Sequence, residues 1–176
     1  MSAPDPVAQA RTYQQSLLAE LGDDDPAVVQ SGTADAIRAL LADAASDART
    51  EPEPGEWSVA GCIAHLTDGE LVVSTRYRWI IAEEQPAIVG YDQALWVANL
   101  RHADDEPEAL LALFETLRRS NLALWERFGR THGDRIGLHN ERGPESYDLS
   151  FRLAAGHDRI HLAQARRALT AVRERR

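Results

Sequence analysis

Three histidines have the residue type and the spacing to bind a metal ion. His157 and His161 lie four residues apart in the segment GHDRIHLAQ, so in a helix they share one face. Apolar residues follow the same spacing, which is typical of a face that packs on a core. A buried imidazole needs a polar partner, and a metal ion is one. His65, in EWSVAGCIAHLTDGE, is the best candidate for a third ligand.

Three neutral imidazoles would leave one coordination position open, which is typical of a catalytic rather than a structural site. Zinc and nickel both accept imidazole ligands. The spacing also fits another interpretation, in which two core histidines bond to carbonyl groups or to Asp158 and Asp68. Residue 158 is Asp and not Glu, so the metalloprotease motif with its general base is absent.

The other three histidines fall in predicted loops or at helix ends. We expect His102 and His132 to be solvated at the surface. His139 lies in a Gly-rich loop just before the last predicted helix, so it could reach the open end of a helix bundle and act on the reacting species. An ordinary surface position is the favoured interpretation of His139, and the catalytic role is the alternative.

Three other residues on the same predicted helix as His65 have charged or reactive side chains. Asp68 is a better candidate than Glu70 to hydrogen-bond the ring of His65, because Glu70 falls on a different face of the helix. Arg76 lies eleven residues further on, about 16 Å along a helix, and is expected to pair with an acidic residue inside the protein. Cys62 is expected to be a small core residue rather than a ligand.

The length and net charge of the chain limit the kinds of protein that it can be. The chain has 176 residues, which predicts one domain over residues 1–176, and its net charge of −9 disfavours a nucleic-acid partner. No apolar run approaches the roughly 18 residues that span a bilayer, and the start MSAPDPVAQAR does not resemble a signal peptide. We therefore expect a cytoplasmic protein that acts on a small molecule.

Helical periodicity runs through the whole sequence, and no alternating strand pattern is present. Capping residues and helix breakers predict helices over residues 6–21, 33–46, 58–83, 107–128 and 147–171. The connection over residues 84–106 is long enough to make the helices on either side parallel. The prediction is an all-α four-helix bundle with an additional N-terminal helix.

The sequence resembles the DinB-like family of metalloenzymes. The resemblance covers about residues 13–169 and rests on PGEWSVAGCIAHLTDGE, RYRW, the crossover YDQALWVANLRHADDEPEALLALFETLRRSNLALW, GLHNERGPES and AAGHDRIHLAQ. It implies a bundle of up-down-down-up topology and a divalent metal held by three histidines, which match His65, His157 and His161. Gly61 departs from the family, where a glutamate is frequent in the WSxxE segment.

The resemblance also indicates an activity. Relatives include S-transferases and isomerases that use a low-molecular-weight thiol, so we expect a metal-dependent thiol S-transferase or a hydrolase, with the thiol as a cosubstrate. The metal would lower the pKa of a bound thiol or water. The alternative is a non-catalytic stress-response protein that binds a metal or a small ligand. A homodimer is implied by the family, and Trp96 and Trp125 are expected to be exposed enough to permit it.

Overall fold

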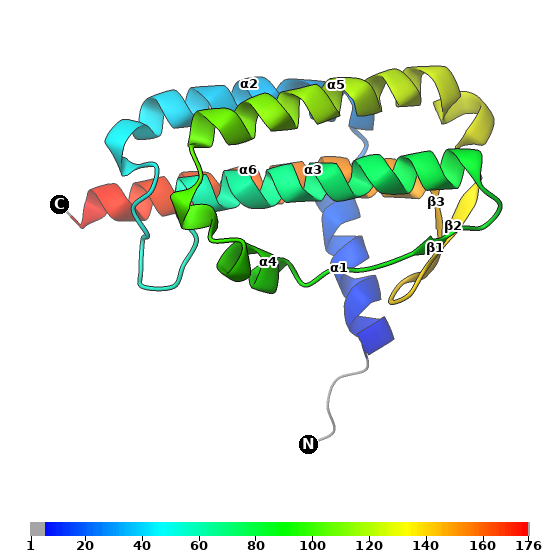
Figure 1. The fold of residues 1–176 in the computed structure, drawn as a ribbon, viewed down its shortest axis with the longest axis horizontal. Coiled ribbons are helices and arrows are strands. Elements are labelled where there is room, and N and C mark those ends of the chain that lie inside the picture. The colour runs from blue at the N-terminus through cyan, green and yellow to red at the C-terminus, as the bar shows by residue number, and fades with distance from the viewer. Residues whose placement is uncertain (1–5, 176) are drawn as a thin grey trace.

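The computed structural model describes the backbone of residues 6–175 and the side chains of residues 11–102 and 104–175. Most of the described chain is helical, as predicted (Figure 1). Its α-helices are α1 (Pro6–Leu21), α2 (Pro26–Ala44), α3 (Val59–Ala82), α4 (Gln93–Asn99), α5 (Pro107–His132) and α6 (Tyr147–Glu174). Short 3₁₀ turns cover Ala45–Asp47 and His102–Asp104.

Side-chain caps set where the helices begin. Ser58 accepts a hydrogen bond from the Gly61 amide at 3.1 Å at the start of α3, and Ser146 caps α6 in the same way. The prediction for α2 was wrong by seven residues, because Asp25 caps it and Pro26 occupies its first turn. The cap predicted at Asp5 lies outside the described residues.

The four long helices α2, α3, α5 and α6 form the bundle. Helix α3 packs against both α5 and α6, and α2 packs against the same two helices from the other side. In Figure 1, α3 and α5 run in one direction, and α2 and α6 run in the opposite direction. The long connection between α3 and α5 returns the chain to the end at which α3 began, and it carries α4. Buried apolar side chains from all four helices fill the centre, among them Ile37, Ile63, Phe114 and Leu162.

A small sheet, which the sequence did not predict, lies at one end of the helical bundle (Figure 1). Strand β1 (Ala87–Ile88) pairs parallel to β2 (Ile136–His139), and β2 pairs antiparallel to β3 (Gly143–Ser146). These strands have two to four residues, too few for an alternating pattern to be detected. The sheet joins the long crossover to the Gly-rich loop before α6.

Helix α5 continues past its predicted end. Gly129 lies inside α5, where a Cβ atom would come within 2.9 Å of the Trp125 ring.

Two tryptophans are less exposed than expected. Trp125 is half-buried and stacks on Phe151 with ring centroids 3.9 Å apart. Trp96 is also half-buried, and its ring centroid lies 4.5 Å from that of Tyr91.

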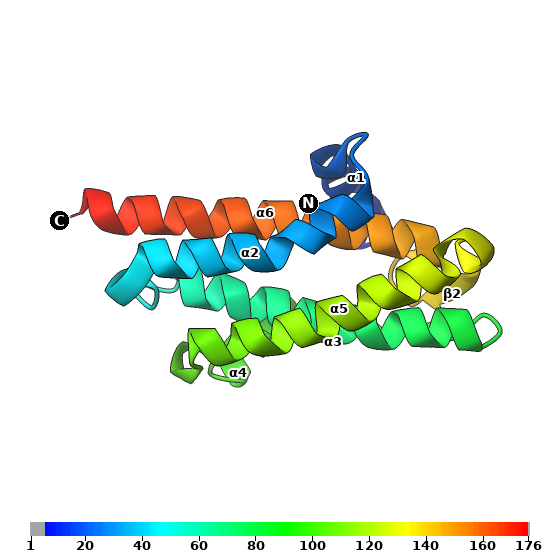
Figure 2. The same ribbon diagram turned by 90° about the horizontal axis from the view of Figure 1, so that it is seen from above.

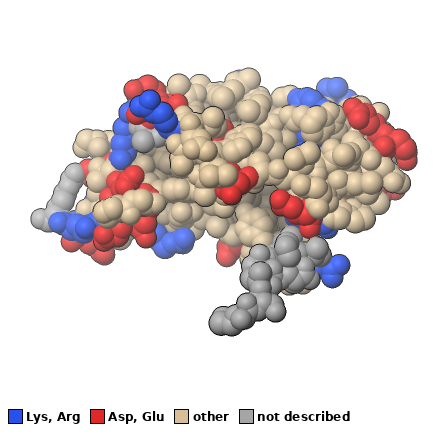
Figure 3. All heavy atoms as spheres, turned by 60° about the horizontal axis from the view of Figure 1, so that its bottom comes forward, with Lys and Arg blue, Asp and Glu red and all other residues tan. Residues whose placement is uncertain are grey.

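Acidic and basic side chains lie interspersed on the face seen in Figure 3, with broad uncharged areas between them. None of the helices in the described part of the chain is both long and apolar enough to cross a membrane.

Helix α1 crosses α6 at a steep angle and touches it very closely (Figure 2). The closest approach is at Gly156, where a Cβ atom would lie 1.9 Å from the carbonyl oxygen of Leu17. Only glycine permits this approach of two backbones. Because Gly156 directly precedes His157, the crossing also fixes α1 beside one of the candidate metal ligands.

Gly156→Ala should therefore destabilise the protein, although alanine is the better helix former. The overpacking should cost about 1–3 kcal/mol and lower the melting temperature by several degrees. Gly32→Ala is the matched control, since nothing lies within 4 Å of a Cβ atom there and it should stabilise α2 by up to about 1 kcal/mol. Equal melting temperatures for the two variants would contradict the close crossing.

Candidate metal centre

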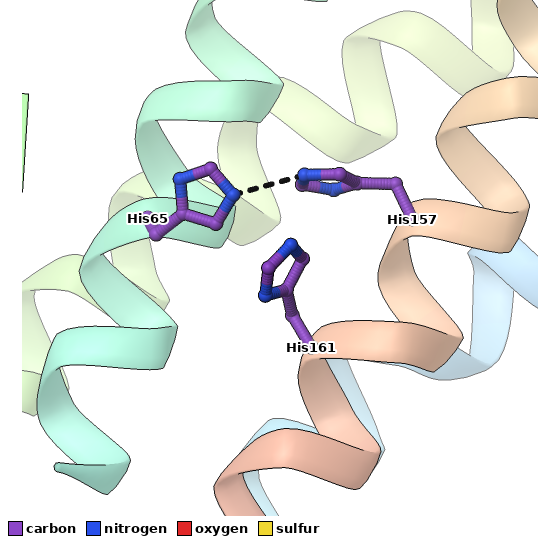
Figure 4. A group of neighbouring side chains, drawn as sticks. All are labelled: His65, His157 and His161. Carbon is purple, nitrogen blue, oxygen red and sulfur yellow. Dashed lines mark hydrogen bonds between the residues drawn. The ribbon is translucent and has the colours of Figure 1, made fainter. Parts of the chain in front are cut away.

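The structure brings His65, His157 and His161 together between α3 and α6. Their ligand atoms all lie within 4.8 Å of one another (Figure 4). The Nε2 atoms of His65 and His157 are 2.9 Å apart. Two nitrogens that bind one ion at about 2.1 Å are separated by roughly 3.0–3.4 Å, so only a small shift would open the cluster around an ion. This is the set of histidines that the spacing and the resemblance predicted.

Neighbouring side chains orient the rings. The Nδ1 atom of His161 lies 2.9 Å from Oε1 of Gln164, and the amide oxygen accepts the imidazole proton. The lone pair of His161 is then on Nε2, as a metal ligand requires. The ring of Trp57 lies 5.0 Å from that of His65 and 6.0 Å from that of His161, between centroids. Trp57 therefore packs beside two of the three rings.

The three imidazoles are held neutral. Burial, and secondarily the neighbouring His161, lower the pKa of His65 to about 3. Burial also lowers the pKa of His157 well below its usual value, with further contributions from His161 and His65. The pKa of His161 is lowered as well, mainly by burial. Neutral imidazoles keep a lone pair free for a cation at physiological pH.

A buried ion network lies beside the histidines, and sequence reasoning missed its centre. The guanidinium of Arg118, on α5, donates to both carboxylate oxygens of Glu70 and to both of Asp158. Thr33 donates to Asp158 and Asn121 donates to Glu70. Asp158 thus binds Arg118 and Thr33, and does not support the interpretation in which it partners a histidine. An Arg and an Asn three residues apart on the inner stripe of α5 were the available signal.

The expectation for His102 was wrong, because the structure buries it with only 6% of its surface exposed. Its Nε2 atom is 2.6 Å from Asp68 and its Nδ1 atom is 2.6 Å from Asp105. The aspartate expected to support His65 therefore binds His102 instead. This bridge fastens the crossover segment to α3. A solvent-exposed position was expected because nothing in the local sequence brings Asp68 to His102.

The bridge predicts a pH dependence of stability. Burial acts to lower the pKa of His102, but its hydrogen bonds to Asp105 and Asp68 outweigh burial, so the pKa is raised. A raised folded-state pKa stabilises the protein below the unfolded pKa of about 6.5, and this is lost as pH rises through the folded value. His102→Gln should therefore cost about 1 kcal/mol more at pH 5.5 than at pH 9.

Urea unfolding of the metal-free wild type and of the variant at both pH values would measure this difference. The free energy of unfolding of the variant is subtracted from that of the wild type at each pH. This subtraction removes the pH dependence caused by the three clustered histidines, which has the opposite sign and is present in both proteins. If His102→Gln lowers the free energy of unfolding by the same amount at both pH values, the imidazole of His102 is not charged in the bridge.

His139 lies apart from the three clustered histidines. It is at the end of β2 with 3% of its surface exposed, so the favoured interpretation of a surface residue was wrong. Its Nδ1 atom accepts the backbone amides of Glu141 at 3.1 Å and Arg142 at 3.3 Å, which puts the ring proton on Nε2. Burial, then Arg142 and Arg76, lower the pKa of His139 to about 4. His132 is half-buried beside Thr131.

Two cavities reach the cluster from different sides. The larger, of about 630 Å³, extends from His157 between α1, α3 and α6 to the β2–β3 hairpin. The other, of about 550 Å³, is lined by Trp57, His161 and Gln164. The clustered histidines are therefore accessible to small molecules.

Comparison with known proteins places the chain in a family. The sequence model of the DinB superfamily matches residues 8–165. A protein of Oceanobacillus iheyensis, named as a candidate metal-dependent hydrolase, is 32% identical over 114 residues, 65% of this chain and 66% of that protein. One of Geobacillus thermodenitrificans with the same description is 31% identical over 80 residues, 44% of this chain and 45% of that protein. The matched regions thus span less than two thirds of either relative.

A solved structure has the same fold. YfiT from Bacillus subtilis, described as a candidate metal-dependent hydrolase with an unusual four-helix bundle topology, superposes with a TM-score of 0.70 at 20% identity. The superposition covers 95% of this chain and 88% of YfiT. The family match covers α3 and the part of α6 up to residue 165, and so includes all three histidines. The chain belongs to the DinB superfamily.

Proposed function

We propose that the protein is a metal-dependent hydrolase in which His65, His157 and His161 hold one divalent ion, zinc or nickel. The observation that carries the proposal is the convergence of three neutral, inward-facing imidazoles between two cavities. A bound ion would supply a Lewis acid that polarises the substrate or a water molecule. The relatives named as candidate metal-dependent hydrolases support the same reaction class.

The chain's own residues have distinct parts in this proposal. Gln164 fixes the tautomer of His161, and Trp57 packs beside the rings of His65 and His161 at the smaller cavity. Glu70 and Asp158 are held by Arg118, so neither is free to take a proton from a substrate. The catalytic role predicted for His139 stays a prediction, and its test is a rate that falls in His139→Ala while the metal content is unchanged.

The second form of the proposal is a metal-dependent S-transferase, which transfers a group to a thiol. Whether Cys62 could supply that thiol depends on its position. Cys62 is fully buried, and burial raises the pKa of its thiol to about 12. The chain's own cysteine is therefore no nucleophile, and a thiol reaction would need a low-molecular-weight thiol as cosubstrate. A non-catalytic metal-binding protein is the alternative, and the homodimer stays a prediction that light scattering would test.

Elemental analysis and paired activity assays would test the proposal. Purified protein should contain one divalent ion per chain, and this protein should hydrolyse p-nitrophenyl acetate faster than the metal-free form. A second assay, with glutathione and 1-chloro-2,4-dinitrobenzene, would show whether a thiol is used. Metal binding without metal-dependent turnover in either assay would favour the non-catalytic alternative, and absence of metal would refute the site.

A further inference from the structure

The larger cavity contains a buried arginine at the end away from His157. Arg76 is 8% exposed and lines the cavity. Its Nη2 group donates to the carbonyl oxygen of Val89 at 2.8 Å. Its Nε–H group is buried and has no hydrogen-bond partner among the described residues. The expectation that Arg76 pairs with an acid inside the protein was wrong for the described part of the chain.

The acid whose charge acts on Arg76, Glu145, already has other partners. The carboxylate of Glu145 accepts two hydrogen bonds from Arg142, at 2.6 and 3.0 Å, and others from Ser150 and Gln14. Arg142 and Glu145 thus form a closed pair beside Arg76. Burial, and then the charge of Arg142, lower the pKa of Arg76 despite the attraction of Glu145. The protein leaves the charge of Arg76 under-compensated.

The contrast with Arg118 shows that this is unusual within the same bundle. Arg118 is 3% exposed and lies between two carboxylates. A buried charge without a counter-ion is costly, so it is expected where a ligand supplies the counter-ion. His139 adds a second unpartnered donor nearby, since its Nε2 atom is buried without a partner among the described residues and its pKa responds to Arg76.

The two ends of the cavity are separated by about two turns of α3. Gly69 lies against His157, where a Cβ atom would be 3.4 Å from the imidazole Cε1. Arg76 is seven residues further along the helix, and both residues line the same cavity. A rise of 1.5 Å per residue puts about 10 Å between these positions. A ligand that reaches both ends must be elongated.

We propose that Arg76 binds the carboxylate group of an elongated substrate whose opposite end reaches the metal at His157. A guanidinium presents parallel N–H groups that match a carboxylate. The neighbouring carboxylate of Glu145 favours a single negative charge over a dianion such as a phosphate monoester. The contact between the opposite end of the substrate and the metal rests on the proposed function, whereas the carboxylate site at Arg76 does not.

The carboxylate site can be tested on metal-free protein by calorimetry with octanoate and octanamide, which have the same chain and differ in the charge and hydrogen-bonding groups of the head. Wild type should bind octanoate at least about tenfold more tightly, a difference of about 1.4 kcal/mol. Arg76→Met should abolish this preference, and Arg119→Met, at an exposed position on α5, should keep it. A preference that is absent in wild type or retained in Arg76→Met would overturn the proposal.

Thermal unfolding supplies a readout that separates binding from structure. Because Arg76 has no ion partner among the side chains that the structure describes, Arg76→Met should melt at the temperature of the wild type or above it, and octanoate should stabilise only the wild type. A melting temperature well below that of the wild type would assign Arg76 a structural role and overturn the proposal. With metal-loaded protein, the dicarboxylate suberate should bind more tightly than octanoate. If suberate and octanoate bind equally to metal-loaded protein while the other results hold, this would count against the metal site and leave the carboxylate site in place.

Discussion

Replacing His161 with alanine should remove most of the bound metal and lower metal-dependent turnover by more than about 100-fold. Three ligands leave no redundancy, and changes to the partners of metal-bound histidines already cost about 10–100-fold in affinity or activity. The fold should survive, because the core of the bundle is built from apolar side chains that do not contact the ion. Elemental analysis, circular dichroism and the hydrolysis assay would measure the three effects separately.

His132→Ala is the matched control for this experiment. His132 is also a partly buried histidine on a long helix, but it bonds to Thr131 and lies outside the cluster. The control should retain the metal and the activity. Full metal occupancy in His161→Ala would remove that histidine from the site and leave His65 and His157 as an incomplete pair.

The candidate metal ligands could be predicted because their signal is local. His157 and His161 share a helix face through their spacing alone, and Ser58 and Ser146 mark the starts of the helices that carry the cluster. The choice of His65 needed residue type and the family resemblance, because no local rule states which two helices pack together. The packing of α3 on α6 supplies that information.

The parts that could not be predicted depend on contacts between distant segments. His102 is buried by Asp68, 34 positions away, and β1 pairs with a strand about 50 positions later. His139 is a buried residue of the same sheet. Arg118 looks like a surface residue by type, and only its two distant carboxylates make an interior position favourable. Such pairings decide burial, and burial decides which polar residues act together.

Arg118→Met should be the most destabilising single substitution in the bundle interior. Two charge-bearing neighbours, Glu70 and Asp158, are 3% and 2% exposed and would lose their common cation. Burial acts to lower the pKa of Arg118, but these two carboxylates outweigh it and raise the value. Removing one partner of a buried ion pair costs about 3–5 kcal/mol, which corresponds to roughly 10 °C in melting temperature for a chain of this size.

Arg119→Met is the control, because the adjacent side chain is exposed and its loss should change stability by no more than about 0.5 kcal/mol. The triple variant Arg118→Met, Glu70→Gln, Asp158→Asn carries no buried charge at this position and should recover part of the lost stability. If it recovers none, the cost in Arg118→Met comes from lost packing rather than from unpaired carboxylates.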